Sequence, residues 1–92
     1  MDRAISFTPE AETQLLKLIY ELEQKYSIRF ADKFSDDLDS LLDLVAKNPE
    51  MFKATSRNKN IRVGLAHKNV SFHYQILPKS IRVLNFKFNR SR

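Results

Sequence analysis

Ten cationic side chains gather in the second half of this sequence, where no acid accompanies them. All eleven acidic residues lie at or before Glu50, whereas residues 53–92 contain ten Lys or Arg and no Asp or Glu. Solubility by itself requires only charges of both signs interspersed along the chain. The separation therefore favours a surface that binds an anionic partner or a protein with an acidic face. A merely solvated surface is the alternative. The residues that we expect to bind a target are Arg57, Lys59, Arg62, His73, Arg82, Lys87, Arg90 and Arg92.

Proton transfer would fall to the two histidines, His67 and His73. Histidine is the side chain that changes its charge near neutral pH. His73 stands between Phe72 and Tyr74, so strand alternation places it on the face opposite that pair. It could serve there as an acid or a base, although a plain exposed or partner-facing histidine is the simpler interpretation.

The acidic residues of the first half favour a solvated surface. Four of them follow helical spacing and would form one stripe: Asp32, Asp36, Asp39 and Asp43. No histidine converges on this stripe, so we expect no metal site and no cofactor. The sequence has no cysteine, which excludes a disulfide scaffold, a Cys-based zinc site and a thiol nucleophile. Its single glycine excludes a glycine-rich phosphate loop.

Length and composition predict one soluble domain. A chain of 92 residues with 42% apolar residues can build one core, which we expect to span residues 1–92. No apolar run approaches the roughly 20 residues that cross a bilayer, and no apolar signal segment follows the N-terminus. We therefore expect an unexported protein of the cytoplasm.

Two helices are predicted in the first half, after a short strand over residues 4–7. Thr8 and Pro9 suit the cap and the first position of a helix that ends near Tyr26. Ser27 suits the cap of a second helix that Lys47-Asn48-Pro49 stops. Each helix carries one apolar stripe, and these are Ala11, Leu15, Leu18, Ile19, Leu22 and Tyr26, then Phe30, Phe34, Leu38, Leu41, Leu42 and Val45.

Residues 50–60 are predicted to form a loop, and three strands are predicted after it, over residues 61–66, 70–77 and 80–88. Their short polar connections predict an antiparallel meander. The fold class is therefore α+β in the order β-α-α-β-β-β, with an antiparallel helical hairpin packed on a small, twisted, mostly antiparallel sheet. One sheet face must cover the helices, which leaves the other face or its rim to expose Arg62, His73, Gln75, Arg82 and Lys87.

Short motifs follow one another in a recognisable order along nearly the whole chain. Residues 5–11 resemble an opening strand with an "s-P-e-A" helix start, residues 30–34 an "A-x-x-F" helix start, and residues 44–52 an "L-x-x-x-P-e" helix end. Arg62 with residues 72–76 and 81–86 resembles "R…f-x-Y-x-i…I-x-i-l-x-f" strands. In this order the motifs resemble the RelE/ParE superfamily of bacterial toxins from type II toxin–antitoxin pairs.

The resemblance implies a toxin that a co-expressed antitoxin holds inactive, with one of two activities. ParE-like members bind and inhibit DNA gyrase, and residues 85–90 look like their "f-f-x-x-R" ending. RelE-like members cleave mRNA in the ribosomal A site without a metal, which requires proton transfer and cations at the phosphorane. The position similar to RelE's arginine on the middle strand falls near Ser71, and no Tyr follows Tyr74. We therefore favour the ParE-like inhibitor.

The same resemblance implies residues for both partners. If the chain is a RelE-like endonuclease, the candidate catalytic residues are Arg62, His73, Arg82 and Arg90. For the antitoxin, a hetero-oligomeric partner, the candidate contacts are Phe86, Phe88, Arg62 and Lys87. A third alternative is a toxin fold that has lost its activity and only binds partners.

Overall fold

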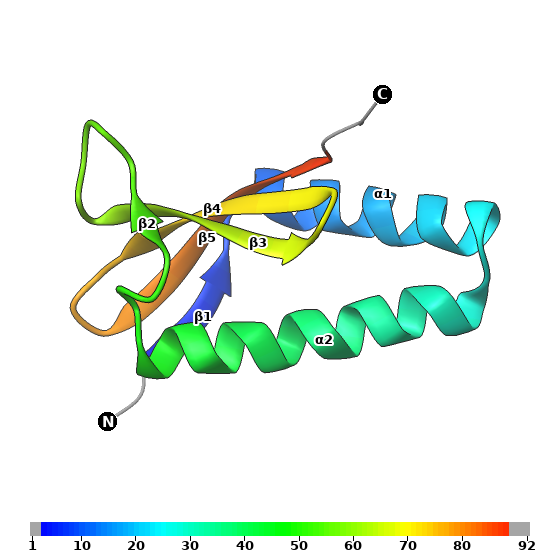
Figure 1. Ribbon diagram of the computed structural model, residues 1–92, viewed down its shortest axis with the longest axis horizontal. Coiled ribbons are helices and arrows are strands. Elements are labelled where there is room, and N and C mark those ends of the chain that lie inside the picture. Colours follow the sequence, from blue (N-terminus) through cyan, green and yellow to red (C-terminus); the bar gives the residue numbers. More distant parts are fainter. Residues whose placement is uncertain (1–2, 89–92) are drawn as a thin grey trace.

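The computed structural model describes residues 3–88, in which two helices cover one face of a sheet (Figure 1). In chain order the elements are β1 (Ala4–Phe7), α1 (Pro9–Lys25), α2 (Ile28–Lys47), β2 (Lys53–Ala54), β3 (Ile61–His67), β4 (Val70–Ile76) and β5 (Ser80–Phe88). The predicted α+β class, helical hairpin and three long strands are confirmed. No helix in the described residues is long and apolar enough to span a membrane.

Both helices begin at the caps that the sequence predicts. The Thr8 Oγ1 accepts a hydrogen bond from the Ala11 N–H at 3.1 Å, and Pro9 occupies the first position of α1. The Ser27 Oγ accepts from the Phe30 N–H at 3.0 Å and caps α2. Because only Tyr26 and Ser27 separate the helices, α2 must fold back along α1.

The apolar stripes are only partly buried at the turn between the helices. Tyr26 is 58% exposed and Phe30 is also exposed, although both were predicted to face the core. Figure 1 shows the reason, since the helices extend beyond the end of the sheet that residues 3–88 form. The two rings stack on each other instead, with 4.6 Å between their centroids.

The strands lie in the order β1-β5-β4-β3-β2, with β1 parallel to β5 and the other pairs antiparallel. The prediction of a continuous loop over residues 50–60 is wrong, because Lys53 and Ala54 pair with Val63 and Arg62 to form β2. A strand of two residues is too short to leave an alternating pattern in the sequence.

A bulge interrupts β5 at Leu84. Tyr74 of β4 lies opposite Val83, but His73 lies opposite Asn85, so Leu84 has no partner on β4. The extra residue inverts the alternation of β5 from that point onward. Side chains at positions 82 and 87, which simple alternation would place on opposite faces, therefore share one face.

The start of α1 supplies hydrogen-bond partners to the bulge. The Thr8 hydroxyl donates to the Leu84 carbonyl at 2.9 Å, and the Thr8 N–H donates to the Val83 carbonyl at 3.0 Å. Two residues on, the Phe86 N–H donates to the Gln14 Oε1 at 2.7 Å. These bonds fix α1 against the irregular part of β5.

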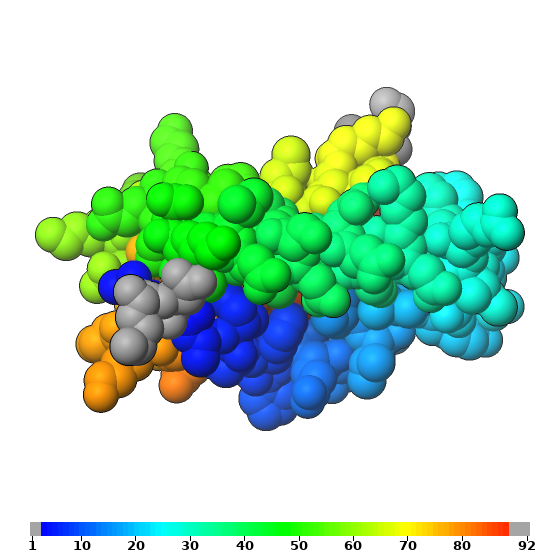
Figure 2. All heavy atoms as spheres, turned by 90° about the horizontal axis from the view of Figure 1, so that it is seen from below, coloured from blue at the N-terminus to red at the C-terminus, as the bar shows by residue number. Residues whose placement is uncertain are grey.

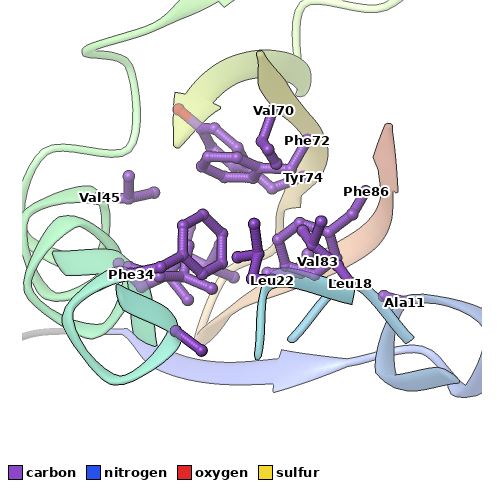
Figure 3. Packing of buried hydrophobic residues seen from close by; sticks show 14 residues of the cluster. Ala11, Leu18, Leu22, Phe34, Val45, Val70, Phe72, Tyr74, Val83 and Phe86 are labelled. Carbon is purple, nitrogen blue, oxygen red and sulfur yellow. The ribbon is translucent and has the colours of Figure 1, made fainter. Parts of the chain in front are cut away.

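The core lies between the helices and the covered sheet face (Figure 3). Leu18, Leu22 and Phe34 from the helices pack toward strand residues that include Phe72 and Val83. Figure 2 views the molecule from the side of the helices, which lie next to each other and hide most of the sheet. Within residues 3–88, no helix covers the opposite sheet face (Figure 1).

Candidate target-binding face

Cross-strand pairing identifies the side chains on the uncovered sheet face. His73 at the centre of β4 lies opposite both Asn85 of β5 and Val63 of β3, and Val63 lies opposite Lys53 of β2. Residues directly opposite each other share a face. We call this surface the open face, and it includes Lys53, Val63, Leu65, Ser71, His73, Gln75, Arg82, Asn85 and Lys87.

The charge of the open face is entirely positive. The strands contain no Asp or Glu, and Arg82 and Lys87 are both exposed on β5. Within residues 3–88, neither side chain has a hydrogen-bond or ion-pair partner. Their pairing positions on β4, Gln75 and Ser71, are four residues apart, which separates the two cations by about 13 Å along the sheet. Both charges are therefore available to an anionic partner.

His73 is held at the centre of this face by one hydrogen bond. Its Nδ1 lies 3.0 Å from the Asn85 Oδ1. An amide oxygen only accepts hydrogen bonds, so this contact assigns the proton of the neutral imidazole to Nδ1 and leaves Nε2 as an acceptor. Asn85 therefore orients a group that can accept a proton or a hydrogen bond on the open face.

Arg62 does not belong to this face, and the prediction that it would be exposed beside His73 is wrong. It lies opposite Tyr74, whose side chain faces the helices. Its guanidinium donates to three backbone carbonyls, with 3.0 Å from Nε to Lys59 O, and 3.3 and 2.9 Å from Nη1 to Glu50 O and Phe52 O. Arg62 thus fixes the segment between α2 and β3.

The alternation of apolar residues along β3 predicts a different arrangement from the one that the structure shows. Ile61, Val63 and Leu65 read as the buried face of a strand, yet Leu65 is 54% exposed on the open face. Gly64 takes the covered side in β3, because the Phe72 ring fills the space above it. The Phe72 ring of β4 therefore fills the core space that an apolar side chain at position 64 of β3 would otherwise occupy. The residue pattern of a single strand does not predict such an exchange between strands.

Tyr74 supports the same segment from the core. Its hydroxyl donates to the Pro49 carbonyl at 2.6 Å. Burial raises the pKa of the Tyr74 hydroxyl above its ordinary value of 10.0, although the nearby backbone of Phe52 and the charge of Arg62 act in the opposite direction. The neutral, donating form is the one that the fold stabilises.

The remaining predicted site residues lie in several places. Arg57 and Lys59 are exposed on the turn between β2 and β3, away from the strands themselves. Phe86 is only 7% exposed and belongs to the core, so Phe88 is the phenylalanine of that pair that a partner can reach. Arg90 and Arg92 lie outside the described residues.

Besides Val63 and Leu65, sequence reasoning missed Lys53 and Asn85 as members of the open face. Lys53 was assigned to a loop, and it reaches the face only because β2 exists. Asn85 was not singled out, since its position beside His73 depends on the bulge at Leu84. The acidic stripe behaves as expected, with exposed carboxylates, and the described residues contain no cluster of His, Asp or Glu that could hold a metal ion.

Comparisons with known proteins agree on one fold. Residues 5–87 match the sequence family described as "ParE toxin of type II toxin-antitoxin system, parDE". A chain from the chromosomal ParDE toxin–antitoxin system of P. aeruginosa superimposes with a TM-score of 0.75 at 14% identity, over 96% of this chain and 97% of that one. None of the curated proteins matches.

Two further solved structures have the same architecture. The YoeB dimer of Staphylococcus aureus gives a TM-score of 0.66 at 14% identity, over 98% of this chain and 100% of that one. The E. coli DinJ–YafQ toxin–antitoxin complex gives 0.64 at 14% identity, over 96% and 93%. At this identity the structural likeness establishes the fold and does not choose between the two toxin types.

Proposed function

The chain belongs to the ParE toxin family of type II toxin–antitoxin systems, and on that premise we propose that it arrests growth by binding and inhibiting DNA gyrase through the open face. The remaining parts of the proposal are that the protein acts in the cytoplasm, that residues 1–92 fold as one domain, and that a cognate antitoxin neutralises the toxin. The antitoxin is a partner that the family implies.

The observation that carries this proposal is the open face itself. Arg82 and Lys87 are exposed, have no partner among the described residues, and stand on a sheet without any acid. A bulge that α1 fixes in place brings both cations to one side. Because the sheet is rigid, the binding of an acidic or phosphate-bearing surface restricts only the rotamers of these two side chains and orders no additional backbone.

The second candidate is a RelE-like mRNA endonuclease, and the hydrogen bond between His73 and Asn85 favours it. An imidazole with a free Nε2 on a cationic face is a suitable general base for a ribose hydroxyl. Of the three candidate catalytic residues that the structure describes, however, only His73 and Arg82 share the open face, since Arg62 is engaged on the other side. This distribution supports the binding inhibitor over the nuclease.

Inducible expression with two readouts separates the candidates. We expect growth arrest, inhibition of purified gyrase in a supercoiling assay, and no new mRNA 5′ ends at ribosomal A sites. A-site cuts with unaffected gyrase would refute the inhibitor and support the nuclease. The absence of any growth arrest would leave a toxin fold that only binds partners.

A charge-neutralised variant, Arg82→Gln with Lys87→Gln, tests the surface. Each exposed charge contact contributes roughly 1 kcal/mol at most, so the concentration needed for half-inhibition of gyrase should rise about tenfold. The matched helix control, Lys17→Gln with Arg29→Gln, removes the same charge from exposed positions on α1 and α2 and should inhibit like the wild type. Equal potency of both variants would show that the open face is not the binding surface.

A further inference from the structure

A second surface, on the opposite side of the sheet from the open face, has features of a binding site. A hollow of about 610 Å³ lies where the start of β1, the C-terminal end of α2, the segment after it and the end of β4 meet. We call it the α2-end pocket. Its apolar lining comes from Leu44, Met51 and Ile76, and its charged lining from Arg3, Lys47 and Glu50.

The apolar part of the pocket is incompletely covered. Leu44 is 49% exposed and Met51 is 45% exposed, although both line the same hollow as the half-buried Ile76. Large apolar side chains that line one hollow and remain accessible favour contact with another apolar side chain, which would remove both from water.

The charged part of the pocket has a net positive charge. The Arg3 Nε donates to the Leu77 carbonyl at 2.8 Å, which fixes the guanidinium while its two Nη atoms have no partner among residues 3–88. Lys47 likewise has no ion pair there, and Glu50 is the one acid in the lining. Two Nη donors at the end of a guanidinium match the two oxygens of a carboxylate.

The wall of the pocket is fixed before any partner arrives. Pro49, Glu50 and Met51 follow α2 without regular structure, but Tyr74 and Arg62 donate hydrogen bonds to the carbonyls of Pro49, Glu50 and Phe52. A wall held at three carbonyls needs little ordering upon binding, which lowers the entropic cost of association.

We propose that the α2-end pocket docks the antitoxin, by receiving an apolar side chain that neighbours a carboxylate in the antitoxin segment. The apolar side chain covers Leu44, Met51 and Ile76, and the carboxylate accepts hydrogen bonds from the Arg3 Nη atoms and from Lys47. The proposal rests on the toxin–antitoxin function, from which the antitoxin follows as a partner. It assigns that partner a surface separate from the open face.

An NMR titration of the full ¹⁵N-labelled chain tests the pocket with defined probes. The probes are three short blocked peptides with identical Gly-Ser flanks and the central sequences Leu-Glu-Leu, Leu-Gln-Leu and Ser-Glu-Ser. We expect the first peptide to shift the amide signals of Arg3, Lys47, Met51 and Ile76. Each of the other two should bind at least about fivefold more weakly, because each lacks one of the two contacts.

Substitution of the cations provides the second arm of the test. Arg3→Gln with Lys47→Gln should weaken the Leu-Glu-Leu peptide at least about fivefold while the spectrum stays dispersed, and the helix control should bind like the wild type. The pocket is refuted if the shifts centre on Arg82 and Lys87, if they centre on the turn near Phe88, if no shifts occur, or if Glu and Gln peptides bind equally. Pocket shifts that depend on protein concentration without peptide would instead identify a second copy as the occupant and overturn the proposal.

Growth arrest distinguishes a failure of the pocket from a failure of the proposed function. If the wild type arrests growth but no peptide binds the pocket, the docking proposal alone is wrong. If the peptide binds as expected but expression has no effect on growth, the pocket chemistry stands and the toxin function is wrong.

Discussion

Gly64 is the position where the fold can be tested most sharply, by substitution with alanine. Gly64 is the only glycine in the chain and lies inside β3. An added Cβ would lie 2.6 and 2.8 Å from two carbons of the Phe72 ring and 3.1 Å from the Phe52 ring. The Phe72 ring is fully buried and has ring neighbours at 5.8 to 6.2 Å, so it has little room to move.

Two opposing effects decide the stability of Gly64→Ala. Alanine loses less backbone entropy than glycine upon folding, which favours the variant by about 0.5–1 kcal/mol. Overpacking against a ring that has little room to move costs about 1–3 kcal/mol. The steric cost therefore wins, and we expect a net loss of about 1–2 kcal/mol, or roughly 4–16 °C in melting temperature for a domain of this size.

Urea and thermal unfolding measure this loss, and a double variant isolates its cause. Phe72→Leu alone should destabilise the protein, but Gly64→Ala added to it should cost less than in the wild type, because the shorter side chain vacates the space above position 64. A Gly64→Ala variant that is as stable as the wild type, or costs that add fully in the double variant, would refute this account of the glycine.

Two further predictions concern hydrogen bonds at the ends of elements. Thr8→Val removes both the cap of α1 and the donor to the Leu84 carbonyl, and should lower the free energy of unfolding in urea by about 2 kcal/mol. Thr8→Ser keeps the hydroxyl and should be nearly as stable as the wild type. Equal losses of stability in both variants would contradict the role of the hydroxyl. Tyr74 has a raised pKa in the folded state, so the stability linked to its proton is fully present below pH 10 and declines as the pH rises through the folded pKa. The stability advantage of the wild type over Tyr74→Phe should therefore shrink above pH 10, and an advantage that is constant from pH 8 to 11 would show that this proton is not linked to folding.

Local chemistry made much of the fold predictable from the sequence. Thr8 and Ser27 are caps whose effect depends on residues three positions away, so the starts of both helices could be read directly. The three long strands could be read for a similar reason, since each spans at least seven residues and carries apolar side chains at short, regular intervals.

The errors lie where a distant segment decides the outcome. Arg62 faces the helix side because it lies opposite Tyr74 in the register of β3 and β4, and the carbonyls of residues 50 and 52 come from the segment that β2 joins to β3. Tyr26 and Phe30 continue a regular apolar stripe, but both remain exposed at the turn between the helices, where the Phe30 ring meets the end of β3 edge-on at His67. On the candidate site, the sequence identified Arg82, His73 and Lys87, while the neighbours that complete the open face depend on pairing and on the bulge.

The separation of charge between helices and strands gives the molecule a permanent dipole. Every acidic residue that the structure describes lies on α1, on α2 or just after α2, whereas the sheet carries only cations. In the field of an anionic target the protein will turn its open face forward before contact, so a larger share of encounters begins in a productive orientation. The association rate should consequently fall steeply as salt shortens the Debye length below the size of the molecule, while the dissociation rate changes much less.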